Sequence, residues 1–477
     1  MAGLVPADFL AAPPRQGSPA LKNRIISLWY RVRYSLWFVP GLMVASALVL
    51  AYITTGLEAN LQLTGGAKLW WIYQGSAQGA RALLSTIAGS MITVAGLVFS
   101  LTMVVLSLAS NQFGPRLVRN FMDDTGNQLV LGTFVATFVY CLVALPSIEE
   151  SGAPLPNLSV SVGLALALAS LGVLIYFIHH IASSIQANNL LASVGHELEA
   201  AVRRLFPEAT DGPTIWAAPE LPQGFDRRAE ELGAQQSGYV QMIDLGRLYD
   251  LARDQDLLIE LTHRPGDFVI AGGVLCRVWP PESFTPELAA RLRRGFTLGV
   301  ERTEAQDVEY VARLLAESAL RALSPGVNDP YTAITCIDWL GSGLALLATR
   351  GRRPSFRLDE NGELRLLLPQ VDFALVAVGC LEPIRRAARE NVMSTVRLLE
   401  VLADLARQVR LPQDHEALTH LAQAVETDIL DNLRLAWDRE LVRQKHQAVM
   451  DELKLSELRL APPPSEGGGE QDEPGRA

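Results

Sequence analysis

The chain has 477 residues, 49% of them hydrophobic, and a formal net charge of −10. This length predicts two or three domains, and the acidic charge gives no electrostatic reason to expect a nucleic-acid partner. The cysteines are far apart and include no CxxC pair, which predicts reduced side chains without a disulfide framework. They are Cys141, Cys276, Cys336 and Cys380.

The chain begins with a Pro-, Ala- and Gly-rich segment, residues 1–24, which is not a cleavable signal peptide and which we predict to be disordered. A transmembrane domain is predicted over residues 25–181, because four apolar runs there are long enough to cross about 30 Å of hydrocarbon. The runs contain no Asp, Glu, Lys or Arg, and one such charge at mid-bilayer would cost about 3 kcal/mol. The predicted spans are 36–55, 83–109, 129–145 and 158–178.

Basic residues beside the spans predict their orientation. Most of these residues precede the first span or follow the second, whereas the alternate loops hold only Lys68 and Arg81. The basic residues on the predicted cytosolic side are Arg15, Lys22, Arg24, Arg31, Arg33, Arg116 and Arg119, with Arg203 and Arg204 somewhat after the fourth span. The pattern therefore predicts an α-helical bundle of about four spans with both termini in the cytoplasm.

The second span differs from the others because small and polar residues recur along it at steps of three, four or seven, which places them on one helical face. These residues are Ser85, Gly89, Thr93, Gly96, Ser100, Ser107 and Asn111. Such a face either packs inside the bundle or lines a polar pathway, alone or at a subunit interface, and both interpretations stay open. The run ends at Gly114, Pro115 and Arg116, which we predict to form a cytosolic hinge. The spans hold no titratable group at depth, which argues against a proton-coupled carrier.

After the spans, the chain has the charge density of a soluble protein. The helical pattern of the fourth span continues over 182–206 as a predicted stalk, and Pro, Gly and Ala predict a linker over 207–236. A cytosolic α+β domain is predicted over 237–370, where short strands between Pro-Gly and Gly-Gly turns indicate a small barrel- or sandwich-like module. Its predicted strands and hairpin are 238–244, 257–261, 264–270, 273–278, 296–302 and 356–368, with a short helix at 248–252. A helical region, 371–457, and a disordered acidic tail, 458–477, follow.

Two further helices are predicted in the α+β domain, at 305–323 and from 331 towards 348, on either side of a Ser-Pro-Gly turn. Asp329 can cap the second helix, and Pro330 suits its first position. Capping explains the segment, but its polar side chains could instead converge on a pocket for a small anion beside a helix N-terminus. The candidate pocket residues are Arg302, Asp307, Asn328, Asp329 and Thr332.

Two pairs of motifs resemble one bacterial family of predicted membrane proteins, called domain of unknown function 2254. The first pair is 90–100 with 111–116, and the second is 322–325 with 328–333. The resemblance covers about residues 25–450. It implies several N-terminal spans and a location in the bacterial inner (plasma) membrane, and it supplies no activity.

The sequence contains no nucleotide-binding loop, metal-ligand spacing or nucleophile motif, so we expect neither an enzyme nor a cofactor. The leading hypothesis is a homo-oligomeric channel or passive transporter, in which the second span lines the pathway and the cytosolic domain assembles or gates it. The alternative is a membrane-anchored sensor or scaffold whose cytosolic pocket binds a small anion or a protein. The expected partners are the lipid bilayer, further copies of the chain, and a small ion or anionic ligand.

Overall fold

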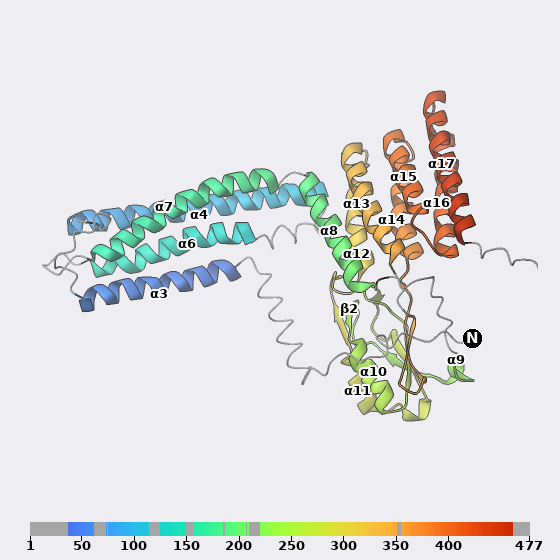
Figure 1. Ribbon diagram of the computed structural model, residues 1–477. Coiled ribbons are helices and arrows are strands. Elements are labelled where there is room, and N and C mark those ends of the chain that lie inside the picture. Colours follow the sequence, from blue (N-terminus) through green and yellow to red (C-terminus); the bar gives the residue numbers. More distant parts are fainter. Residues whose placement is uncertain are drawn as a thin grey trace, which may run out of the picture. The chain divides into compact units, whose positions relative to one another are not determined.

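The structure is a computed structural model that describes residues 37–61, 73, 75–113, 125–148, 156–184, 187–206, 208, 220–350 and 354–460. The described chain divides between Leu190 and Leu191 into an N-terminal unit and a C-terminal unit (Figure 1). The predicted N-terminal tail, 1–24, lies outside the described residues, and so does the part of the predicted C-terminal tail from 461 to 477.

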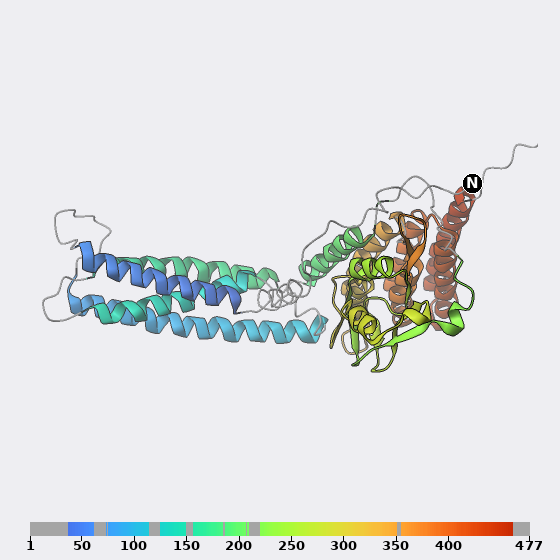
Figure 2. The ribbon, with the colours of Figure 1, turned by 90° about the horizontal axis from the view of Figure 1, so that it is seen from below.

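Four long helices are described in the N-terminal unit, and they run side by side (Figure 2). They are α3 (Phe38–Leu61), α4 (Ala77–Phe113), α6 (Thr125–Ala144) and α7 (Asn157–Ser184), and a 3₁₀ helix, η1 (Leu145–Ser147), follows α6. Each long helix overlaps one predicted span and is long and apolar enough to cross a membrane. With 37 residues, α4 is about 55 Å long and therefore exceeds the hydrocarbon thickness of about 30 Å.

Helix α6 is the centre of this unit, because it contacts α3, α4 and α7. Its Tyr140 is fully buried, and the Tyr140 hydroxyl lies 3.1 Å from Thr54 Oγ1 and donates to the carbonyl of Ser159 at 3.1 Å. The hydroxyls of Thr137 and Ser170 lie 3.1 Å apart between α6 and α7. A polar group without a partner is costly in hydrocarbon, so these bonds fix α3 and α7 against α6.

The predicted stalk, 182–206, differs from what the structure describes. Helix α8 (Ala187–Leu205) packs against the C-terminal unit with a buried face that includes Leu191, Val194 and Leu198. Ser342 Oγ donates to Glu199 of α8 at 2.7 Å, which adds a polar contact to the same interface. From Leu191 onward, α8 is thus part of a folded unit and does not stand as a free stalk.

A β-rich module with two sheets opens the rest of the C-terminal unit. One sheet has the order β1 (Glu230–Gly233), β5 (Val274–Trp279), β3 (Leu258–Leu261), β8 (Leu364–Leu367) and β7 (Phe356–Leu358), and the other has the order β4 (Phe268–Val269), β2 (Gly238–Ile243) and β6 (Phe296–Gly299). All strand pairs are antiparallel except β3 with β8. Both sheets share one hydrophobic core with α10 (Leu245–Asp254) and α11 (Pro286–Arg293). Among the described strands, the sheets remain separate and do not close into one barrel.

The predicted linker, 207–236, contains regular structure in its described part. It holds the short helix α9 (Phe225–Arg228) and strand β1, in which Leu232 pairs with Cys276 of β5 and is fully buried. Only one of the four residues of β1 is buried, so the strand lacks the apolar alternation that identifies strands from sequence. Its pairing comes from β5, more than forty residues further along the chain.

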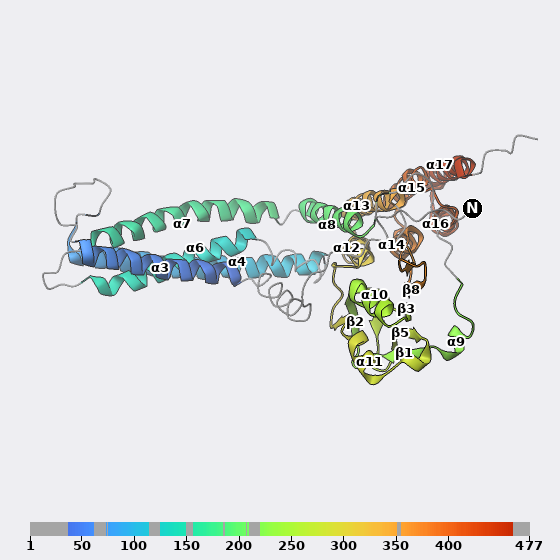
Figure 3. The same ribbon diagram turned by 60° about the horizontal axis from the view of Figure 1, so that its bottom comes forward.

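Seven helices of the C-terminal unit lie in two rows (Figure 3). One row contains α8, α13 (Pro330–Thr349), α15 (Val392–Ala406) and α17 (Ala436–Leu460), and the other contains α12 (Val308–Ala322), α14 (Phe373–Ala388) and α16 (Pro412–Asn432). Leucine-rich faces meet between the rows, with Leu315, Leu340, Leu381 and Leu399 among the buried side chains.

Helix α13 is a fifth helix that could cross a membrane by its length and composition. In the structure it contacts α12 and α15, and it carries a charged residue, Asp338, whose Oδ1 accepts a hydrogen bond from Arg397 of α15 at 2.5 Å. The surroundings of α13 are therefore those of a core helix in a folded, charged unit.

The contact between α8 and α13 gives a test of the C-terminal unit. A Cβ at Gly195 would lie 2.3 Å from the indole of Trp339, so Gly195→Ala should overpack this contact and cost about 1–3 kcal/mol. We expect a midpoint of thermal unfolding several degrees lower, measured by circular dichroism on the purified protein. Gly326→Ala is the matched control, because a Cβ there meets open space. Equal midpoints for the two variants would contradict the packing of α8.

Candidate functional site

The polar face predicted on the second span lies on the exterior of the N-terminal unit. Its residues Ser85, Gly89, Thr93, Gly96, Ser100 and Ser107 are all exposed on α4. A Cβ added at Gly89 or Gly96 would meet nothing within 4 Å. The side chain of Asn111 and the predicted hinge, Gly114, Pro115 and Arg116, lie outside what the structure describes.

The buried side of α4 is the opposite one. Its buried residues are Ala80, Leu84, Ile87, Ala88, Ala95, Val98 and Val105, which pack in the cores shared with α6 and α7. With about 100° of rotation per residue, the polar face is centred roughly opposite to this side. Of the membrane-length windows, that of α4 is only 17% buried, whereas that of α6 is 44% buried. The polar face therefore does not pack against other helices in the described part of this bundle.

The chemistry of this face is uncharged. Thr93 Oγ1 donates to the carbonyl of Gly89 at 2.8 Å, so that hydroxyl is satisfied within its own helix. The glycines leave the backbone open to close approach by another helix or by water. The face can thus accept a second helix or a file of water without a charge at depth.

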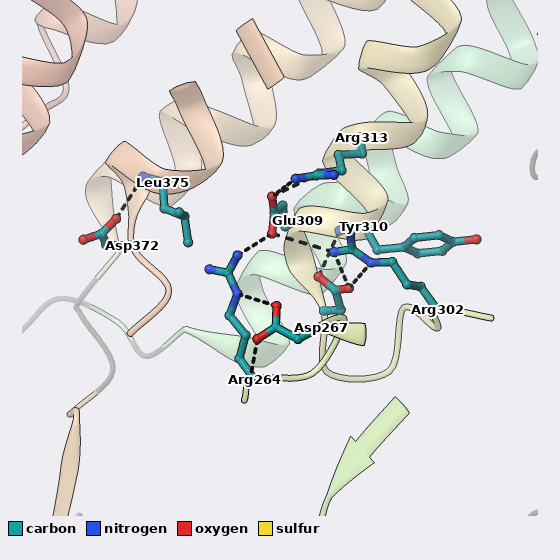
Figure 4. Close-up of polar contacts among 9 residues, drawn as sticks. Arg264, Asp267, Arg302, Glu309, Tyr310, Arg313, Asp372 and Leu375 are labelled. Carbon is teal, nitrogen blue, oxygen red and sulfur yellow. Dashed lines mark hydrogen bonds and ion pairs between the residues drawn. The ribbon is translucent and has the colours of Figure 1, made fainter. Parts of the chain in front are cut away.

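A second group of polar residues lies at the start of α12 (Figure 4). The carboxylate of Glu309 is buried, with 5% of the residue exposed, and three arginines surround it. Arg313 Nη2 lies 2.6 Å from Glu309 Oε1, Arg264 Nη2 lies 3.1 Å from Oε2, and Arg302 Nη2 lies 3.7 Å from Oε2. We call this group, together with Asp267 and Asp307, the Glu309 cluster.

Asp307 has two roles in the Glu309 cluster. Its Oδ2 lies 2.6 Å from Arg302 Nη2, while its Oδ1 accepts from the backbone N–H of Tyr310 and caps α12. Burial raises the pKa of Asp307 above its usual value, and the Arg302 guanidinium opposes this rise. Gly266 has a φ of 98°, and a Cβ there would lie 2.1 Å from Asp307 Oδ2, so only glycine lets this loop approach the cap.

The formal charges of the Glu309 cluster balance. Three guanidinium groups face three carboxylates, those of Asp267, Asp307 and Glu309. Buried charges are tolerated when they are paired in this way, and no positive charge is left over to bind an anion. The cluster joins the loop before β4 to α12, and it has the composition of a structural junction.

The other predicted pocket residues lie at the far end of α12. Asp329 caps α13 by accepting from the backbone N–H of Thr332 at 3.1 Å and from the Thr332 hydroxyl at 2.6 Å. Asn328 adopts a φ of 49° in the preceding turn. Because Asp307 precedes α12 and Asp329 follows it, the two caps are separated by the length of a 15-residue helix, about 22 Å. The structure brings Arg302 to Asp307 and Asp329 to Thr332, but it does not bring the five residues into one pocket.

Sequence reasoning missed Arg264, Asp267, Glu309 and Arg313. Glu309 and Arg313 have the i,i+4 spacing of a helical ion pair, which was a usable signal. The link from Glu309 to Arg264 spans 45 positions and has no local signature. Over the described residues, no group of three or more His, Cys, Asp or Glu side chains is arranged to hold a metal ion, and the four cysteines are free and buried.

A family model described as "Predicted membrane protein (DUF2254)" matches residues 33–404. An uncharacterized protein of Mycobacterium bovis is 35% identical over 412 residues, which cover 83% of this chain and 77% of the relative. An uncharacterized protein of Mycobacterium tuberculosis matches with the same identity and coverage. No solved structure matches the chain.

The Glu309 cluster predicts a large effect of one isosteric change. Glu309→Gln removes one charge from a buried network and leaves its arginines undercompensated, which costs on the order of 3 kcal/mol. We expect a clear fall in the thermal unfolding midpoint of the purified protein. Glu416→Gln, at an exposed position of α16, should stay within about 0.5 kcal/mol of the original. A Glu309→Gln variant as stable as the control would refute a structural role.

The cap at Asp329 predicts a pH-dependent effect. Asp329→Ala should cost about 1 kcal/mol near neutral pH, and Asp329→Asn much less, because asparagine also caps. Hydrogen bonds from Thr332 lower the pKa of Asp329, so its stabilisation is present above the unfolded value of about 3.9 and is lost as the pH falls through the folded value. The difference between the original protein and Asp329→Ala should therefore shrink in acid, as followed by thermal unfolding across pH. An alanine variant with a constant deficit down to strong acid would be incompatible with this cap.

Proposed function

We propose that this chain, which belongs to the DUF2254 family of predicted membrane proteins, assembles with further copies of itself into a passive pathway for small ions or molecules. In this proposal α4 supplies the polar face of the pathway. The chain crosses the inner membrane with α3, α4, α6 and α7, both termini are cytoplasmic, and the C-terminal unit assembles or gates the pathway.

The observation that carries the proposal is the exposure of the polar face of α4 in the single chain. An isolated bundle would hold Ser85, Gly89, Thr93, Gly96 and Ser100 against lipid chains, where small residues gain little from burial. Contact with a neighbouring copy or with a column of water stabilises these small and polar residues more than contact with lipid chains does. The supporting detail is that this face lies opposite the packed side of α4, so an oligomer could use it without disturbing the bundle.

The residue spacing supports close contact between copies around such a pathway. Gly89 with Thr93, and Gly96 with Ser100, are pairs of small residues four positions apart, which let membrane helices approach closely. Hydroxyls and glycine carbonyls can then replace part of the water around a permeant species. A narrow lining without fixed charge also suits a constriction that opens by wetting.

The orientation in the proposal rests on the basic residues. Lys and Arg are concentrated before α3 and between α4 and α6, which favours the cytosolic side for those segments. We propose no enzyme activity and no cofactor. The sensor alternative is weaker, because its five pocket residues are divided between two helix caps and the charges of the Glu309 cluster balance.

Flux across reconstituted liposomes tests the pathway with a matched pair of variants. Gly96→Leu puts a bulky side chain on the polar face of α4 and should abolish flux. Gly172→Leu makes the same change on α7, where a Cβ also meets open space, and should leave flux unchanged. Flux is measured with ion- and solute-sensitive dyes under voltage, membrane tension and candidate ligands. Absence of flux from the original protein under every condition, or equal loss in both variants, would overturn the proposal.

Cysteine crosslinking in native membranes tests the assembly separately. The native cysteines are buried, so an introduced thiol can be followed against a low background. Ser100→Cys should form a crosslinked dimer under mild oxidation, whereas Gly172→Cys should not. Crosslinking at both positions or at neither would argue against contact through the polar face of α4.

A further inference from the structure

Helices α8, α13, α15 and α17 of the C-terminal unit run parallel, so they begin at the same end of their row. Asp338 of α13 pairs with Arg397 of α15. Further along both helices, a Cβ at Gly341 of α13 would meet the side chain of Val401 of α15, so the two helices run in the same direction. Glu400 of α15 pairs with Lys445 of α17, and further along both helices Arg407 pairs with Glu452, so α15 and α17 also run in the same direction. On α8, Gly195 faces Trp339 and Leu198 faces Gly343. The first turns of α8, α13, α15 and α17 therefore lie at one level.

Large apolar side chains are exposed at this end. Tyr331 in the first turn of α13 is 70% exposed, and Trp437 in the first turn of α17 is 79% exposed. Val327, Met393 and Leu435 are also exposed, in or beside the turns that precede or begin the same row. We call these five side chains the N-terminal tip of the row. Two arginines in neighbouring turns, Arg389 and Arg434, are exposed at the same end, and Arg389 Nε lies 3.7 Å from the carboxylate of the exposed Glu390.

A short connection joins α8 to α7 in the sequence. Helix α7 ends at Ser184 and α8 begins at Ala187, so two residues join a membrane-length helix to the first turn of the row. Such a connection spans about 10 Å at most. The opposite end of the row lies farther from this connection, because the helices run towards that end for their full length.

We propose that the N-terminal tip of the row rests on the cytosolic surface of the lipid bilayer, with Tyr331 and Trp437 as interfacial anchors. Trp and Tyr prefer this region because their rings are apolar while their polar atoms can still reach water. Arg434 reaches phosphate headgroups, and the partial positive charge of four helix N-termini points the same way. This inference does not depend on whether α4 conducts.

The contact fixes the height of the C-terminal unit above the membrane. A row tilted away from the bilayer would leave the tip in water, where its exposed aromatic rings contribute no free energy of burial. A row that rests on the bilayer buries those rings and keeps the β-rich module, which lies beyond the other end of α12, clear of the lipid.

Spin labels on the full chain in liposomes test the inference. Tyr331→Cys and Trp437→Cys are labelled in separate samples, and Leu455→Cys is the control, because it is exposed on α17 towards the other end. Collisions with oxygen, which concentrates in lipid, are compared with collisions with a water-soluble nickel complex. We expect the oxygen-to-nickel ratio to be several-fold higher at 331 and 437 than at 455. Unchanged thermal unfolding midpoints establish that the labelled proteins are folded.

Two results would overturn the inference. Nickel access at 331 and 437 equal to that at 455 would place the tip in water. Exclusion of both reagents at these positions would show that protein, such as a second copy of the chain, covers the tip. Neither result would bear on flux through α4, so the failure of this inference and the failure of the proposed pathway are distinguishable.

Discussion

Hydrocarbon offers no hydrogen-bond partners, and this constraint determines the arrangement of the N-terminal unit. Two polar side chains that α6 carries inward are bonded to its neighbours, Tyr140 to Thr54 and Ser159, and Thr137 to Ser170. With α6 surrounded by the other three helices, the long helix α4 is left at the edge with only one side covered. A face that would be hidden at the centre of a bundle thus becomes available to lipid, water or another copy.

A different solution holds the C-terminal unit together, because charge is buried there and compensated. Glu309 forms ion pairs with Arg313 of its own helix and with Arg264 in the loop before β4. These pairs connect the β-rich module to the two helical rows. The same carboxylate lies near Gly379 of α14, where a Cβ would come within 3.4 Å of it. Glu309 and Asp307 are the most buried members of the Glu309 cluster, so removing either carboxylate would leave guanidinium groups uncompensated.

The predictable parts of the molecule were those whose signals are local. The four long helices of the N-terminal unit could be located because composition alone excludes such runs from water, and the hairpin of β7 and β8 was identified by its Asn-Gly turn. The polar face of α4 could be predicted from the sequence. Its exposure could not, because it depends on which side of α4 packs against α6 and α7. Glu309 and β1 were missed because their partners, Arg264 and β5, are distant in sequence. The five candidate pocket residues lie apart because Asp307 caps α12 and Asp329 caps α13, beyond the other end of α12.

The parallel pairing of β3 with β8 has a consequence for synthesis of the protein. Ile259 leaves the ribosome long before Leu366, with which it pairs, and α12 and α13 are made in between. At bacterial elongation rates this delay is on the order of ten seconds. During that interval one edge of β3 has no neighbour, and an unpaired strand edge invites association with other nascent chains. The nascent chain therefore needs protection by chaperones most between the synthesis of β5 and the synthesis of β8.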